Sequence, residues 1–370
     1  MSNSINVDTL LPCGEKIKPL LVKSCISDTD LKNLLAKRGI FIGSNHKQSS
    51  VPLISMSILS PKEFEELQER QKVKEDSLKM RTSNVKCTSD VALVEMIPND
   101  LIEAEKISSV NDSLEFDSDL SFNINDKNEM AIEYKIKRDD VTKDWASSQS
   151  IYEGRVVVKK DEETSKIEFV NEFTSDETKD INNEIIRNVR GFLVTSNHLK
   201  QSDGIEMITS SNFTNEERFK FMLSLVNNSP SGLLEFESIR NVEIGPVENV
   251  SLPADVQWMA QKVKNMIING NSLQELTFIK NDQYHNCLIL REIEAKYKFN
   301  YAGAKGSCII EFGFPHYFRK NTSNNEFQAT MAYLHLSRES SGANKKNVTR
   351  FLMNEFNALK AEKFKLIKNG

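Results

Sequence analysis

The sequence predicts an α+β protein in which an N-terminal helical module is followed by mixed antiparallel-sheet and helix domains. Helix-capping signals with leucine stripes gather near the N-terminus, whereas alternation of apolar and polar residues appears in clusters further on. The predicted strands neighbour one another, which is typical of the α+β class. We predict a helical module at 1–83, an acidic connector at 84–127, a small β-meander with a helix at 128–204, and an α+β domain at 205–370.

The helical module is predicted from its capping residues. Ser27 precedes Asp30 in a capping box, a stripe of leucines follows at 31–35, and Gly39 ends this first helix. A polar loop leads to a second apolar stretch at 51–59. Another capping box at 60–63, with proline at the first helical position, predicts a third helix that runs into the charged stretch at 69–79.

In the middle of the chain an acidic segment is followed by a segment in which apolar and charged residues alternate. Seven acidic residues and one lysine lie between Asp100 and Asp119, so we predict a solvated connector there. Apolar and charged residues then alternate at 132–136, the period of a half-buried strand. Two more strands are expected at 151–158 and 167–173, followed by a capped amphipathic helix at 174–192.

The C-terminal half repeats this mixture. Helices are predicted at 214–226 and 253–268, and a hairpin from strands at 287–299 and 307–314. Further helices are expected near 325–338 and at 346–367. The segment 345–368 has seven basic and two acidic residues, which predicts a basic amphipathic helix at the end of the last domain.

Composition and charge limit the function classes. With 370 residues, 39% of them hydrophobic, and a net charge of −5, the chain is not a general polycation, so any nucleic-acid surface must be local. The five cysteines form no CxxC pair, which argues against a zinc ribbon or a thioredoxin-type pair. We expect a cytoplasmic protein with no membrane contact, because neither a signal-peptide pattern nor a bilayer-length apolar stretch is visible.

The helical module offers a candidate DNA-binding surface. Residues 27–40, the polar loop and residues 51–54 resemble the SAP-like helix–extended loop–helix motif, whose members contact the DNA backbone. The cations Lys32, Lys37, Arg38 and Lys47 would gather near one helix end and its loop, where they could contact phosphates. The alternative is a protein-docking domain whose lysines are merely solvated, and this alternative stays open.

A second candidate DNA-binding element contains Arg319 and Lys320. They follow aromatic residues at 312, 314, 317 and 318, which could stack on bases while the two cations hold phosphates. Aromatic residues at a strand end pack more often into a core or a partner interface. Both interpretations remain open at the level of sequence.

A weak catalytic alternative is formed by Asp282, Glu294 and Lys296. The restriction-nuclease superfamily places an aspartate and a Glu-x-Lys on adjacent strands, where the carboxylates hold Mg²⁺. Asp282 lies in a strand-like stretch, and alternation would put Glu294 and Lys296 on the same face. Glu-x-Lys patterns recur in this charged sequence by chance, and no histidine spacing, phosphate-binding loop or nucleophile elbow supports another enzyme. No cofactor is predicted, apart from Mg²⁺ under this alternative.

Several segments together resemble a bacterial defence family, the second subunit of a two-gene antiphage system associated with gamma-mobile-trio islands. These segments are 10–15, 30–41, 51–53, 59–64, 144–147 and 177–180. The resemblance implies a hetero-oligomer with a nuclease subunit encoded by the neighbouring gene. This chain would then be a non-catalytic subunit that contacts or senses double-stranded DNA. A purely structural assembly subunit is the other alternative.

Overall fold

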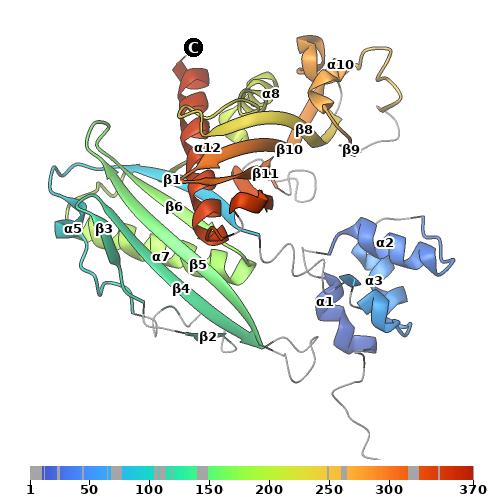
Figure 1. Cartoon of the computed structure of the whole chain (residues 1–370), viewed down its shortest axis with the longest axis horizontal. Helices are drawn as coiled ribbons and strands as arrows, with labels where there is room; N and C mark the ends of the chain where they lie inside the picture. Colours follow the sequence, from blue (N-terminus) through green and yellow to red (C-terminus); the bar gives the residue numbers. More distant parts are fainter. Residues whose placement is uncertain are drawn as a thin grey trace, which may run out of the picture. The chain divides into compact units, whose positions relative to one another are not determined.

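The computed structural model confirms the α+β class (Figure 1). It describes residues 11, 13–22, 26–43, 46–64, 66–67, 77–103, 107, 114–117, 120–139, 149–247, 250–259, 265–315, 325–340 and 342–369. The chain forms two compact units, each discontinuous in sequence. The first contains 1–76, 92–157 and 173–193, and the second contains 77–91, 158–172 and 194–370. The boundaries of the four predicted domains stay predictions.

Short helices build the N-terminal part of the first unit: η2 (Gly14–Ile17), α1 (Lys18–Val22), α2 (Asp28–Lys37) and α3 (Lys47–Ser55). The predicted capping box of α2 is present, because Ser27 Oγ accepts from the Asp30 amide and Asp30 accepts from the Ser27 amide. A shared core encloses their apolar faces, with Leu20, Leu31 and Leu35 fully buried. Burial of such side chains holds together helices too short to be stable alone.

The remainder of the first unit is a small sheet with a helix on one face. Its elements are α5 (Leu93–Met96), β2 (Leu114–Phe116), β3 (Asn123–Asp126), β4 (Glu129–Asp139), the first part of β5 (Gln149–Asp161) and α7 (Asp176–Thr195). Tyr134 on β4 donates its hydroxyl proton toward α7, 2.8 Å from Asn182 Oδ1 and 2.9 Å from the Thr178 carbonyl oxygen. Gly154 on β5 is required there, because a Cβ atom would lie 2.3 Å from the Tyr134 ring.

The second unit contains a larger sheet in the order β6–β1–β12–β11–β10–β8–β9. Its strands are β1 (Lys79–Lys86), β6 (Lys166–Phe173), β7 (Glu206–Met207), β8 (Leu234–Pro246), β9 (Met266–Asn269), β10 (Leu288–Tyr301), β11 (Ala304–Gly313) and β12 (Gln328–Leu336). The ladders from β1 through β12, β11, β10 and β8 to β9 are antiparallel. The predicted hairpin is confirmed as β10 and β11.

Helices α8 (Asn215–Ser224) and α12 (Lys345–Asn369) pack on this sheet (Figure 1). Phe356 of α12 lies 5.1 Å from Phe312 between ring centroids, in a core of aromatic side chains. Shorter helical turns complete the unit: η5 (Ser210–Asn212), η6 (Leu273–Glu275), α10 (Thr277–Lys280), η7 (Asp282–Tyr284) and η8 (Arg338–Ser340). The predicted helices at 174–192, 214–226 and 346–367 are therefore confirmed.

Three helix predictions are wrong. Residues 254–258 form turns and Met266–Asn269 is strand β9, whereas a helix was predicted over 253–268; residues 260–264 lie outside the described part. Strand β12 replaces the helix predicted near 325–338, because it pairs with β11 on one side and β1 on the other. The helix predicted to run on to Lys79 stops before it, since Lys79 begins β1.

Candidate functional site

Arg38, one of the predicted DNA contacts, is held inside the helical module. Its Nε donates to Glu63 Oε1 at 2.9 Å, and its Nη2 donates to Glu63 Oε2 at 2.5 Å and to the Ile58 carbonyl oxygen at 2.8 Å. Glu63 also accepts from the Ser60 amide, which confirms the predicted capping box. The hydrogen bond from Arg38 lowers the pKa of Glu63 to about 2. Arg38 therefore joins the end of α2 to the next helical turn.

The other predicted cations of the module lie around the same helices. Lys37 Nζ is 3.0 Å from Glu66 Oε2, and both side chains are exposed. Lys47 donates to the Val22 carbonyl oxygen at 3.1 Å. Lys32 is half-buried on α2. Lys37, Arg38 and Lys47 thus bind carboxylates or backbone oxygens of the module itself. DNA contact by these residues and by Lys32 stays a prediction.

The module also exposes large apolar side chains that the sequence reasoning missed. Phe41 is 83%, Met56 87% and Ile58 81% exposed. Because Arg38 binds the Ile58 carbonyl, the segments 38–41 and 56–58 are held near each other. Exposed apolar residues of this size, gathered in one small domain, are typical of a protein-docking surface. Phe41 follows the end of the first predicted helix, whereas Met56 and Ile58 lie inside the apolar stretch predicted at 51–59, so no sequence signal separated these two from core residues.

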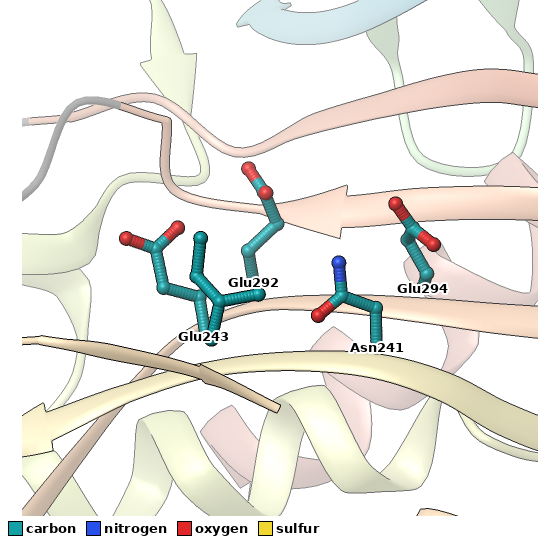
Figure 2. A pocket seen from close by; sticks show the side chains of 5 residues that line it. Asn241, Glu243, Glu292 and Glu294 are labelled. Atoms are coloured by element: carbon teal, nitrogen blue, oxygen red, sulfur yellow. The ribbon is translucent and has the colours of Figure 1, made fainter. Parts of the chain in front are cut away.

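Further along the chain, a small pocket lies between three strands of the second unit. Its walls are Asn241 and Glu243 of β8, Ile267 of β9, and Glu292 and Glu294 of β10. Figure 2 shows the polar side chains rising from the same side of β8 and β10. Its volume is about 20 Å³, which is room for one water molecule. Small-molecule sites are usually of several hundred cubic ångströms (roughly 300–1,000 Å³), so this pocket is not a metabolite site.

Carboxyl side chains are crowded together in this pocket. Strand pairing places Glu292 opposite Glu243 and Glu294 opposite Glu311. Like charges directly opposite each other destabilise a sheet. Arg291, itself buried, forms an ion pair with Glu243, which also accepts from Asn265 Nδ2 at 2.7 Å. Burial, and then the nearby carboxylate of Glu311, raise the pKa of Glu292 well above its usual range. Glu292 therefore tends to keep its proton.

The predicted nuclease residues are divided between two places. Asp282 lies in η7 and not in a strand; its side chain is 79% exposed, with Oδ1 3.3 Å from His285 Nδ1. Glu294 and Lys296 do share a face of β10, but Lys296 Nζ lies 2.9 Å from Glu237 Oε2. No hydrogen bond or ion pair within the described residues joins Asp282 to Glu294 or Lys296.

No group of three or more His, Cys, Asp or Glu side chains among the described residues could hold a metal ion. The Mg²⁺-dependent alternative requires only two carboxylates, and so stays a prediction. Glu294 was found from its motif, whereas Glu243, Glu292 and Asn241 were missed, because only the pairing of β8 with β10 brings them together.

The second predicted DNA-binding element is only partly visible. Arg319 and Lys320 lie outside the described residues, as do residues 144–147 of the family resemblance. Phe312 and Phe314 are buried; Phe314 packs edge-on against Phe327 with ring centroids 5.5 Å apart. These two aromatic residues belong to the core, in agreement with the alternative interpretation, and are not available for base stacking.

The fold and these sites define an α+β chain with an N-terminal helical domain that has its own core, together with a negatively charged pocket in its larger sheet. Residues 15–77 match the family model described as the GAPS4b protein N-terminal domain. This match agrees with the antiphage family that the sequence resembles. It supports the interpretation of this chain as a component of an antiphage defence system. It does not bear on the SAP-like resemblance. Among the described helices, none is long and apolar enough to cross a membrane.

No curated protein matches the chain. The DynU16 crystal structure, of a protein in the dynemicin biosynthetic locus, aligns with 79% of this chain and 97% of its own at 8% identity. Its TM-score is 0.15, so it carries no argument about fold or function.

Proposed function

We propose that the chain is a non-catalytic, DNA-contacting or sensing subunit of a bacterial antiphage nuclease complex. The observation that carries this proposal is the match of residues 15–77 to the GAPS4b N-terminal domain. Lys37 of α2 is exposed, which supports a local contact with phosphate. The contact must be local because the net charge of −5 gives no general attraction to DNA. The nuclease would lie on a partner chain encoded by the neighbouring gene.

The DNA contact is tested best at Lys32 and Lys37, because replacing Arg38 would also break its hydrogen bonds to Glu63 inside the module. The variant Lys32→Glu/Lys37→Glu should weaken binding of the complex to double-stranded DNA. It should also reduce the slope of log affinity against log salt by about 1 to 2, the amount expected for two phosphate contacts. Lys200→Glu/Lys305→Glu makes the same charge change at two exposed positions of the second unit and is the control. If both variants had the same affinity for DNA and the same salt slope, the module would not contact DNA through these lysines.

A second function of the module, protein docking, is favoured by the exposure of Phe41, Met56 and Ile58. Replacing Phe41 and Met56 by serine should abolish assembly with the product of the neighbouring gene, measured by light scattering after size-exclusion chromatography. Leu366→Ser, at an exposed apolar residue of α12, should leave assembly intact. Loss of assembly in the first variant alone would assign the module to docking.

The nuclease alternative predicts a different result. If Asp282, Glu294 and Lys296 were catalytic, the purified chain would cleave plasmid DNA with Mg²⁺, and Glu294→Ala would stop cleavage. Under our proposal the chain alone leaves the plasmid intact, and cleavage requires the partner. A purely structural subunit would be indicated if neither the chain nor its complex shifted labelled DNA.

A further inference from the structure

The pocket of β8, β9 and β10 contains more negative charge than the structure neutralises. Arg291 pairs with Glu243, and its Nη2 is 3.8 Å from Glu292 Oε2. Among the described residues Glu294 forms no ion pair, and it faces Glu311 across the β10–β11 ladder. Like charges placed opposite each other, without a visible benefit to the fold, are expected at binding sites. A cation from outside the chain would stabilise this arrangement.

A buried hydrogen-bond acceptor independently indicates that a donor binds in the same pocket. The Oδ1 atom of Asn241 is buried and accepts no hydrogen bond from a described residue, and its side chain lines the pocket (Figure 2). A buried acceptor without a donor costs about 1–3 kcal/mol, and buried polar groups in native proteins nearly always have a partner. The group that fits the pocket must therefore carry positive charge and donate several hydrogen bonds.

The size of the pocket selects among such groups. A volume of about 20 Å³ admits a group the size of a water molecule. The ammonium group of lysine has this size, carries three donors, and lies at the end of a flexible four-carbon stem. The planar guanidinium of arginine is larger. A metal ion is disfavoured, since no described cluster of His, Cys, Asp or Glu could hold one.

Strand β9 indicates how such a lysine would reach the pocket. It ends the strand order of the sheet, where it pairs with β8, and its Ile267 is 54% exposed beside the carboxylates. Lysine side chains bury their methylene stems along apolar surface while the charged head stays among polar groups. We propose that the pocket, with Ile267 at its side, is a docking site for a lysine on an extended segment of a partner protein that crosses this face of the sheet. This inference rests on the part of the proposed function in which the chain assembles with another protein.

The proposal is tested on the full chain with the peptide acetyl-Thr-Val-Lys-Val-Thr-amide. Calorimetry should show binding, and the methyl resonance of Ile267 should shift during the titration. The double variant Glu292→Gln/Glu294→Gln should bind at least about tenfold more weakly, because it removes the charge of Glu294 and the carboxyl of Glu292 that can ionise beside the ammonium group. Glu235→Gln, at an exposed glutamate on the same strand as Glu243, should bind as the unchanged chain does.

Two further measurements make the outcome decisive. The same peptide with an acetylated lysine should not bind, and this arm needs no variant of the protein and so is independent of folding. The proposal is overturned if the lysine peptide shows no Ile267 shift at millimolar concentration, if acetylation does not matter, or if Mg²⁺ occupies the carboxylates and the peptide does not compete. None of these peptide measurements depends on DNA binding by the helical module, so a failure of this inference is distinguishable from a failure of the proposed function.

Discussion

At the scale of single residues, Glu292 links the pocket to the stability of the second unit. Its carboxyl is flanked by Glu243, Glu294 and Glu311, with Arg291 as the nearby cation. Because burial and these carboxylates raise its pKa in the folded state, the fold binds the proton more tightly than the unfolded chain does. The stabilisation is complete below the unfolded value near pH 4.3 and is lost as pH rises through the folded pKa.

Glu292→Gln should therefore make stability less dependent on pH. Glutamine keeps the shape and stays neutral, so the melting temperature of the variant should fall less than that of the unchanged chain between about pH 5 and pH 9. Each unit of pKa shift corresponds to about 1.4 kcal/mol. The measurement is thermal unfolding across this range, with Glu235→Gln as the control for a lost surface charge. Parallel curves for the two proteins would show that Glu292 is ionised in the fold throughout.

At the scale of elements, the Arg38–Glu63 pair holds the end of α2 to the helical turn at 61–64. We expect Arg38→Gln to destabilise this contact by about 1 kcal/mol, after allowing for partial exposure to solvent, because it also frees the Ile58 carbonyl. Hydrogen exchange should become faster in both segments. Lys37→Gln removes the neighbouring exposed pair with Glu66 and should change exchange little.

The contact between Arg38 and Glu63 also predicts how the stability of the helical module changes with pH. The folded pKa of Glu63, about 2, lies below the unfolded value, so its stabilisation is present above about pH 4.3 and is lost as pH falls toward 2. Arg38→Gln should abolish this acid dependence of the module. If both variants exchanged alike, the ion pair would contribute no more than an ordinary surface pair.

The elements also show how far the sequence could be interpreted. Capping boxes at Ser27 and Ser60 were readable because a cap and its partner lie three residues apart. Strand β12 was not, since an apolar pattern of its length fits helix or strand until the neighbouring strands β11 and β1 decide. The acidic pocket depends on the register of β8 with β10, with three irregularities along the ladder, and no local pattern encodes that register.

At the scale of the whole molecule, α12 joins distant parts of the second unit. Arg350 lies 3.4 Å from Glu172, Asn357 donates to Glu168 at 3.2 Å, and Lys360 donates to Thr82. The last helix of the chain is thus tied by polar contacts to β6 and to β1, the first strand of the unit. Contacts so far apart in sequence raise the contact order of the unit, which is typical of slowly folding proteins.

Within this interface Lys360 has an unfavourable position, because its charged group is fully buried. Burial lowers its pKa to about 8, below the value near 10.4 of the unfolded chain, so the folded state binds the proton less tightly. The resulting destabilisation is complete below about pH 8 and disappears as pH rises toward 10. Lys360→Met should therefore stabilise the protein by about 1–2 kcal/mol at pH 7, the lost bond to Thr82 being the smaller effect.

This gain should shrink as the pH is raised, because the unfolded chain then loses the same proton. Urea unfolding at about pH 7 and about pH 10 measures the difference, and Lys365→Met, at an exposed position of the same helix, should change stability little at either pH. A variant that is equally destabilised at both pH values would mean that the bond between Lys360 and Thr82 outweighs the cost of burying the charge. In that case α12 would be held to β1 mainly by this polar contact, and less by its apolar face.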